Sequence, residues 1–216
     1  MSTAPDLSAA ALLRRFAVHG RYYAHEHAGR RYELRSHLEI FDHALPWPEA
    51  RSRQADLVAV MMNPGGSRPL AEPDADGWAP AMPDRTQYQL MKLALLNTAW
   101  PVRHIRVINL SDLRTPKSAE LFATLPQVGE WHSLFSPGRS DALARALGAP
   151  DTPVLLAWGL SPALRGLATQ ALAATRGHPL LGLTDDGLAY RHPLPQRADL
   201  QRQWLDSVLE QCKRIC

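Results

Sequence analysis

Amide and imidazole side chains lie beside apolar segments at three places in the sequence. Asn63 follows one apolar run and precedes Pro64 and Gly65, Asn109 ends a second run, and His192 lies in a late proline-rich segment. An amide binds both donors and acceptors, and an imidazole can donate, accept or carry a proton. If the fold brings these residues together, they suit binding of, or catalysis on, a polar molecule.

Each of these residues also has a purely structural interpretation. Asn63-Pro64-Gly65 is a good turn sequence, because Asn caps, Pro fixes φ and Gly allows positive φ. A buried Asn109 needs partners for its oxygen and its nitrogen, which a neighbouring loop could supply as readily as a ligand. His192, between Arg191 and Pro193, also fits a surface loop. From the residues alone, both interpretations stay open.

The elements that would position these side chains follow from the pattern of apolar residues. Short apolar runs bounded by turn residues are typical of strands buried on both faces, and here they alternate with helical patterns. Such alternation predicts crossovers and a parallel sheet covered on both sides. We expect strands at residues 56–62, 105–110, 153–158 and 179–184, and helices at residues 7–18, 84–98, 119–125, 140–147, 163–174 and 199–214.

The expected fold class is α/β, a three-layer α/β/α sandwich with a central, mainly parallel four-stranded sheet. The length of 216 residues suits a single domain over 1–216, with a core at 56–214 and a peripheral N-terminal part at 1–50. Within that part, an N-terminal helix precedes residues 31–41, which alternate like an edge strand or hairpin arm. Residues 65–83 form a long irregular stretch, which in a compact domain is usually functional or mobile.

The predicted topology brings the polar signals to one edge of the sheet. In open α/β sheets, ligands bind where the strands end and the loops begin. Asn63, Asn109, the Trp158-Gly159 pair and His192 each end or follow a predicted strand. We therefore expect the functional site at the carboxyl ends of the parallel strands, beside Asn63.

Composition and missing motifs narrow the possible functions. The chain is 45% hydrophobic and 21% charged with a net charge of +3, which is ordinary for a globular protein and does not oppose a nucleic-acid partner. It contains no phosphate-binding loop, dinucleotide fingerprint or nucleophile elbow, which gives little support to nucleotide-triphosphate or serine hydrolysis.

Metals, cofactors and membranes are not expected. Both cysteines lie in the last five residues, and His25-Glu26-His27 has no third ligand placed nearby. No segment approaches the length of a membrane span, so a cytoplasmic location is expected.

Across about residues 30–210, the sequence resembles an uncharacterised family of bacterial and phage domains of unknown function. The family pattern comprises an apolar strand with Asn-Pro, an Asp-x-Thr helix start, an apolar-Asn-Leu strand end with Arg, an apolar-Trp-Gly strand and a late His-Pro-Leu. In this chain the corresponding residues are Met62-Asn63-Pro64, Asp84-Arg85-Thr86, Ile108-Asn109-Leu110 with Arg114, Ala157-Trp158-Gly159, and His192-Pro193-Leu194. The resemblance brings no established activity.

More distantly, the same landmarks are similar to the uracil-DNA glycosylase superfamily. That resemblance implies that Asn63, with Met62, Pro64 and Gly65 around it, positions the attacking water. It implies that Asn109 reads the edge of the base and that Trp158-Gly159 ends the third strand. It also implies that His192 stabilises negative charge on the departing base.

Two residues of the expected site differ from the superfamily pattern. Met61 replaces a glycine that lets the base approach closely, and Leu194 replaces a phosphate-facing serine. An apolar Leu194 could act as a wedge in the base stack. Trp78 and Tyr88 are candidates for stacking on a flipped base. Candidate phosphate contacts are Arg114, Arg191 and Arg197.

Three functions fit the sequence. The first is a protein that binds a nucleobase or nucleic acid and cleaves an N-glycosidic bond, with Asn63 and His192 as its catalytic residues. The second is a non-catalytic module that binds a nucleotide or nucleic acid in the same crevice. The third is a hydrolase or transferase that acts on a free nucleoside or another small molecule. The sequence predicts the first by a small margin, with DNA or a nucleotide as partner.

Overall fold

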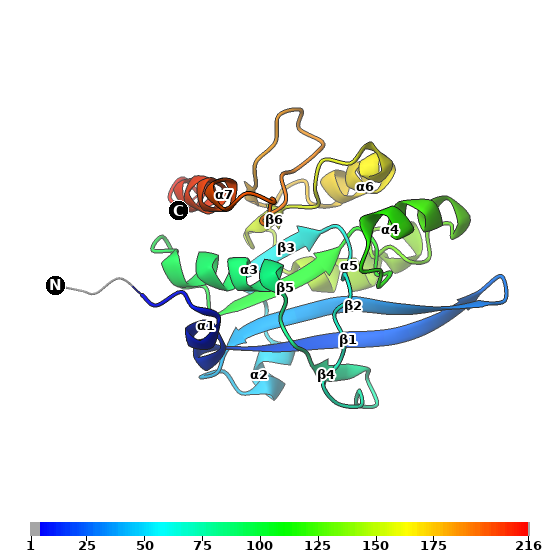
Figure 1. Ribbon diagram of the computed structural model, residues 1–216, viewed down its shortest axis with the longest axis horizontal. Helices are drawn as coiled ribbons and strands as arrows, with labels where there is room; N and C mark the ends of the chain where they lie inside the picture. The colour runs from blue at the N-terminus through cyan, green and yellow to red at the C-terminus, as the bar shows by residue number, and fades with distance from the viewer. Residues whose placement is uncertain (1–4, 216) are drawn as a thin grey trace.

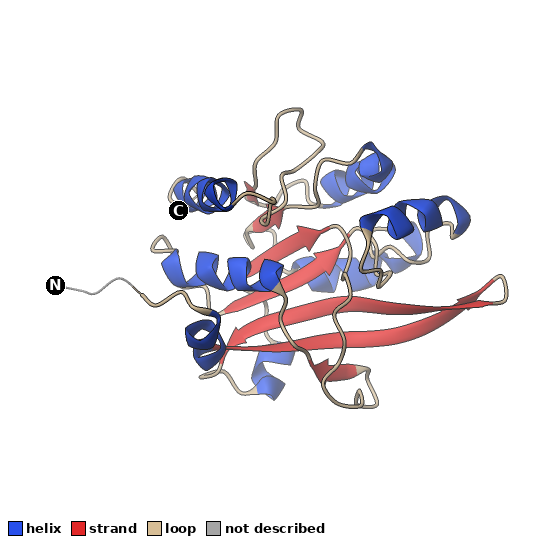
Figure 2. Ribbon diagram, viewed as in Figure 1, coloured by secondary structure: helices blue, strands red, loops and turns tan. Residues whose placement is uncertain are grey.

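The computed structural model describes residues 5–215 as an α/β fold built on one mixed sheet (Figures 1 and 2). The strands are β1 (Phe16–His27), β2 (Arg30–Asp42), β3 (Leu57–Met61), β4 (Trp78–Pro80), β5 (His104–Asn109), β6 (Val154–Leu156) and β7 (Leu180–Leu181). The helices are α1 (Ala9–Arg15), α2 (Trp47–Ser52), α3 (Arg85–Leu96), α4 (Ser118–Thr124), α5 (Ser140–Leu147), α6 (Arg165–Ala174) and α7 (Ala198–Cys212), with short 3-10 turns at Leu125–Gln127, Pro137–Arg139 and Pro162–Leu164. The α/β class expected from the sequence is confirmed.

The sheet has the strand order β4-β1-β2-β5-β3-β6-β7. The four strands β5, β3, β6 and β7 pair with one another in parallel. β2 pairs antiparallel with β5, and β1 pairs antiparallel with both β2 and β4. The long β1–β2 hairpin extends beyond the rest of the fold (Figure 1). Residues 16–42 thus lie within the sheet, between β4 and β5.

The expected number of strands and one helix boundary are corrected by the structure. The sheet contains seven strands in the described part of the chain, not four, because residues 16–42 and 78–80 add β1, β2 and β4. The helix expected at residues 7–18 ends at Arg15, since alternate residues from Phe16 onward are buried, as in a strand. The long stretch 65–83 is not wholly irregular, because it contains β4.

Apolar side chains explain why helices cover both faces of the sheet. β3 and β5 are buried along their whole length, as is typical of central parallel strands. On one face, they pack against Leu12 of α1, Leu90 of α3 and Trp204 of α7. On the other face, Leu143 of α5 and Ala168 of α6 belong to a second core cluster. The start of α3 is fixed by a capping box between Asp84 and Gln87.

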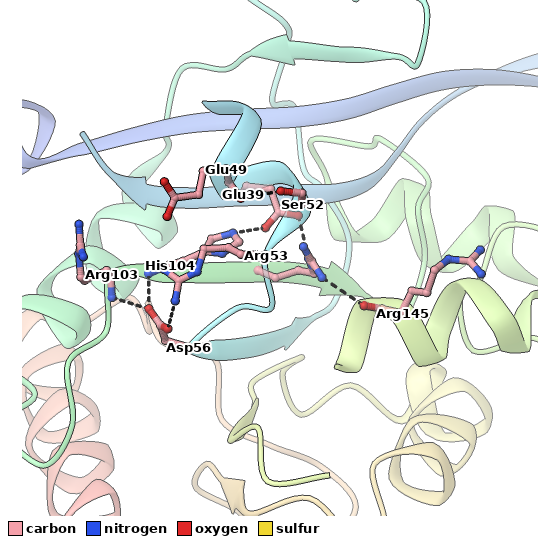
Figure 3. A network of polar contacts seen from close by, with 9 residues as sticks. Glu39, Glu49, Ser52, Arg53, Asp56, Arg103, His104 and Arg145 are labelled. Carbon is pink, nitrogen blue, oxygen red and sulfur yellow. Dashed lines mark hydrogen bonds and ion pairs between the residues drawn. The ribbon is translucent and has the colours of Figure 1, made fainter. Parts of the chain in front are cut away.

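A buried polar network joins the antiparallel and parallel parts of the sheet (Figure 3). The carboxylate of Glu39 on β2 is 1% exposed and lies 2.7 Å from both His104 Nε2 and Arg106 Nε on β5. Arg106 also donates to the carbonyl of Arg145 in α5, 3.2 Å away. Burial opposes ionisation of Glu39, but these donors outweigh it and hold the pKa of Glu39 below its ordinary value.

The stability of the protein should fall as the pH decreases from about 6.5 to about 4, in part because of His37. Burial of this side chain on β2 lowers its pKa to about 4, from 6.5 in an unfolded chain. Between those pH values the unfolded chain binds more protons than the folded protein, so acid favours unfolding by up to about 3 kcal/mol at this residue. Urea denaturation across this pH range should show the effect. As the pH falls, the free energy of unfolding of the native protein should decrease relative to that of His37→Gln. A difference between the two proteins that stays constant with pH contradicts this assignment.

No helix within residues 5–215 combines the length and the apolar character needed to cross a lipid bilayer.

Candidate functional site

A cavity of about 290 Å³ lies at the carboxyl ends of β3 and β5. Its apolar wall includes Met61 of β3, Leu90 of α3 and Val107 of β5. The full lining consists of Arg35, Met61, Met62, Asn63, Pro64, Gly65, Asp84, Thr86, Gln87, Leu90, Val107, Asn109, Thr115, Pro116, Ser118 and His192. Six residues expected at the site therefore meet in one cavity, although they come from three separate segments of the chain. We call this cavity the Asn63 pocket.

Asn109 is the last residue of β5 and is fully buried. It follows Val107 on the same face of the strand, and its Cα pairs with that of Met61. Neither its amide nitrogen nor its amide oxygen has a hydrogen-bond partner within the described residues. A buried polar group without a partner is unfavourable by about 1–3 kcal/mol. The amide is thus left available for a ligand with both a donor and an acceptor.

Asn63 has a fixed amide orientation. Its Nδ2 lies 3.1 Å from the carbonyl oxygen of Leu113, and 3.0 Å from both the carbonyl and the hydroxyl oxygen of Thr115. Because carbonyl oxygens only accept, the nitrogen must face the loop after β5. The Oδ1 atom is then the one that remains to accept a hydrogen bond from water or from a ligand. An amide oxygen does not act as a general base.

Asn63→Asp should destabilise the protein by about 2–3 kcal/mol, although the two side chains have the same shape. A carboxylate oxygen would replace Nδ2 and face the two carbonyl oxygens of Leu113 and Thr115. Urea denaturation at pH 7 measures the change. Asn63→Ala is the matched comparison, and it should lose less stability because it introduces no charge. Equal or smaller losses for Asn63→Asp are incompatible with the observed amide orientation.

His192 lies in the loop between β7 and α7 and lines the pocket. Its Nδ1 accepts a hydrogen bond of 3.2 Å from the backbone N–H of Leu194, so the proton of the neutral ring resides on Nε2. Burial lowers the pKa of His192 and outweighs the opposite effect of the Asp84 carboxylate. At pH 7 the side chain is therefore a neutral hydrogen-bond donor.

Trp158, Gly159, Trp78 and Tyr88 lie outside the Asn63 pocket. Trp158 and Gly159 line a separate cavity of about 40 Å³, and the indole of Trp158 donates to the carbonyl of Leu188. Trp78 belongs to β4 and lines another cavity, with its ring 5.1 Å from that of Trp47. Tyr88 packs against the core beneath α3. The apolar side chains that flank a ligand in the pocket are aliphatic.

The residues expected to contact nucleic acid are spread around the pocket. Arg114 lies against the Tyr22 ring, with its Nε 2.8 Å from the carbonyl oxygen of Ser67. Arg191 and Arg197 are exposed and form ion pairs of 2.7 and 2.5 Å with Asp185 and Asp199. Leu194 follows His192 and is partly exposed. None of these four side chains lines the pocket.

Arg35 is a charged pocket residue that the sequence did not reveal. It is 2% exposed, and its Nε and Nη1 have no hydrogen-bond partner within the described residues. Strict alternation along residues 31–41 would place Arg35 on the face of His37 and Glu39, away from the pocket. A register shift in the β1–β2 ladder changes that face, and nothing in the local sequence signals the shift. The neighbouring polar side chains of Thr86 and Gln87 come from the start of α3.

The chemistry of the pocket favours a polar organic ligand. Its side-chain donors and acceptors are three amides, three hydroxyls, an imidazole and a guanidinium, together with the Asp84 carboxylate. Residues 5–215 contain no group of three or more His, Cys, Asp or Glu side chains arranged to hold a metal ion. Compared with known proteins, the chain matches no family model, no curated protein and no solved structure.

Proposed function

We propose that this protein binds a nucleobase in the Asn63 pocket and cleaves the N-glycosidic bond that joins the base to DNA. The observation that carries the proposal is the amide of Asn109, which is fully buried and unpartnered in the same pocket as His192 and Asn63. A nucleobase edge presents the adjacent donors and acceptors that such an amide requires. The similarity of these residues to the uracil-DNA glycosylase superfamily supports the same proposal.

The size and position of the pocket suit one extruded base. At about 290 Å³, it is at the lower end of the range for ligand sites and is large enough for a single nucleobase. A base must leave the duplex stack to enter such a pocket, which requires a few kcal/mol and least for a mismatched or single-stranded base. The proposal includes a glycosylase-like core in which β5, β3, β6 and β7 form a four-stranded parallel sheet. The order of these strands supports it.

The proposed reaction depends on stabilising the departing base. As the C1′–N bond breaks, both of its electrons move to the base, which becomes an anion. The Nε2–H of His192 donates a hydrogen bond to a carbonyl oxygen of that base, and Asn109 binds the adjacent edge. Asn63 Oδ1 orients a water whose oxygen bonds to C1′ and whose proton passes to solvent. Since Asn63 cannot remove that proton, the proposed cleavage is slow.

A second candidate function is a binding module without catalysis. It is favoured by Met61, whose side chain lines the pocket where the glycosylase pattern has glycine, and by the lack of a general base at Asn63. The module would hold a base or nucleotide in the same pocket and release it unchanged. The two functions differ in one product, the abasic site.

The test is incubation of the protein with single- and double-stranded oligonucleotides that carry uracil, hypoxanthine or mismatches. Alkali then cleaves each abasic site, and gel electrophoresis resolves the products. His192→Ala is the control variant, since it removes the donor to the departing base. Leu155→Ala, in the core behind the pocket, is the comparison for loss of stability alone.

Cleavage by the native protein that is lost in His192→Ala establishes the glycosylase and identifies its base. Salt-sensitive oligonucleotide binding without cleavage supports the binding module instead. If the protein neither binds nor cleaves any oligonucleotide, the glycosylase and the nucleic-acid-binding form of the module are both wrong, and the function to test next is action on a free nucleoside or another small molecule.

A further inference from the structure

A β-bulge turns Arg35 toward the Asn63 pocket. In the β1–β2 ladder, His37 pairs with Arg21, but Arg35 pairs with Tyr22, so Ser36 is an extra residue on β2. Leu38 lies on the sheet face that packs against α3, and without the bulge Arg35 would lie on the opposite face. Bulges often redirect a side chain next to a functional site. Here the redirected side chain is the only arginine that lines the pocket.

The guanidinium of Arg35 is buried, and within residues 5–215 it has no ion-pair partner at contact distance. No carboxylate of residues 5–215 forms an ion pair with it within 4.0 Å, and its Nε and Nη1 have no hydrogen-bond partner there. The nearest acid that lines the pocket, Asp84, accepts a hydrogen bond from the backbone N–H of Gln87 and caps α3. Burial is the largest effect on Arg35 and lowers its pKa, whereas a hydrogen bond with the Tyr22 side chain and the charge of Asp84 favour the protonated form.

Burial of a guanidinium with unsatisfied N–H groups is unfavourable, and Nε and Nη1 of Arg35 are both unsatisfied within residues 5–215. Arginine remains charged in proteins, so the side chain cannot escape this penalty by losing its proton. The unsatisfied N–H groups of Arg35 are therefore suited to donate hydrogen bonds to a ligand in the pocket. A guanidinium presents several donors in one plane and matches an oxyanion better than a neutral carbonyl.

We propose that Arg35 binds a negatively charged oxygen of the ligand, so that the Asn63 pocket prefers an anionic base to the neutral base of the same shape. This inference rests on the proposed function and assigns to it a second group that stabilises the departing base. His192 is neutral and supplies a dipole, whereas Arg35 supplies a full charge that is already in place before the bond breaks. The same oxyanion chemistry would be met by a phosphate, and the experiment separates the two sources.

The experiment is isothermal titration calorimetry at pH 7 with uracil, barbiturate and inorganic phosphate as separate probes. Barbiturate is a pyrimidine of nearly the same shape as uracil that carries a negative charge at this pH. The variants are Arg35→Met, which removes the charge from a buried site, and Arg35→Lys, which keeps a charge but not the planar donors. Arg202→Met makes the same change at an exposed residue of α7 and is the matched control.

We expect the native protein to bind barbiturate about tenfold to a hundredfold more tightly than uracil. Arg35→Met should bring the two affinities together, Arg35→Lys should retain part of the difference, and Arg202→Met should retain all of it. Thermal unfolding of each variant shows whether it is folded during the titration.

The other outcomes separate this inference from the proposed function. If phosphate binds in an Arg35-dependent manner and neither pyrimidine binds, Arg35 is an oxyanion site for phosphate and the nucleobase function is wrong. If uracil and barbiturate bind native protein and Arg35→Met with the same ratio of affinities, the inference is overturned while base binding stands. Failure of both anionic probes to bind the native protein also overturns the inference.

Discussion

Replacing Arg35 by methionine should raise the free energy of unfolding of the ligand-free protein by about 1–4 kcal/mol. The substitution removes a guanidinium that is 2% exposed and lacks partners for Nε and Nη1. Methionine fills a similar volume and packs readily against Leu90 and Val107, which line the same pocket. Chemical denaturation in urea measures the change, and the midpoint should increase without a change in its slope.

Two variants limit how this result can be interpreted. Arg202→Met should change stability by less than about 0.5 kcal/mol, since this arginine is exposed on α7. Arg35→Lys should gain little, because it leaves a charge in the same buried place. A loss of stability in Arg35→Met would mean that the guanidinium supports the fold, through Tyr22 or Asp84, and would remove the main reason to assign it to a ligand.

Arg35 and Asn109 are both expected to lower the free energy of unfolding of the ligand-free protein. Both are buried, both have side-chain polar atoms without a hydrogen-bond partner in the described part of the chain, and both line the same cavity. Residues that bind ligands often reduce the stability of the free protein, and their replacement by apolar residues restores it. The combination of gained stability and lost binding at one residue therefore distinguishes a binding group from a structural group.

The parts of the site that lie on regular strands could be predicted from the sequence. Leu57–Met61 and His104–Asn109 are short apolar runs, so the positions of Asn63 and Asn109 at the end of a parallel pair follow from the pattern alone. His192 could be placed there because the last loop returns to the same edge. These positions depend on the pairing of β3 with β5, and that pairing does not change when a helix boundary is misplaced by one or two residues.

The parts that depend on register and tertiary contact could not be predicted. The face of Arg35 is set by the extra residue at Ser36, and a shift of one residue exchanges the two faces of a strand. Trp78 follows a loop-like segment in the sequence, but in the structure it belongs to β4, pairs with Arg21 of β1 and contacts Trp47. The unpaired state of the Asn109 amide likewise depends on which neighbours surround it in three dimensions.

Glu39→Ala should lower the free energy of unfolding by about 3–5 kcal/mol, the largest stability loss expected of any single charged residue in the sheet. The Glu39 carboxylate lies 2.7 Å from both His104 Nε2 and Arg106 Nε, and its removal would leave both side chains buried without this partner. Its pKa is below the ordinary value, so its contribution is present above about pH 4.5 and is lost as the pH falls through the lower folded-state pKa. Urea denaturation at pH 7 measures the effect.

Glu39→Gln and Glu120→Ala are the controls for that experiment. Glutamine keeps the shape and one acceptor oxygen but not the charge, so it should lose less than Glu39→Ala, and exposed Glu120 in α4 should matter little. A small loss in Glu39→Ala would show that His104 and Arg106 find other partners. Glu39 and Arg35 are both buried charges on β2. Glu39 has its donors in place, whereas Nε and Nη1 of Arg35 have no hydrogen-bond partner in the described part of the chain. Opposite effects of removing them on stability would therefore identify the network around Glu39 as part of the fold and Arg35 as part of the site.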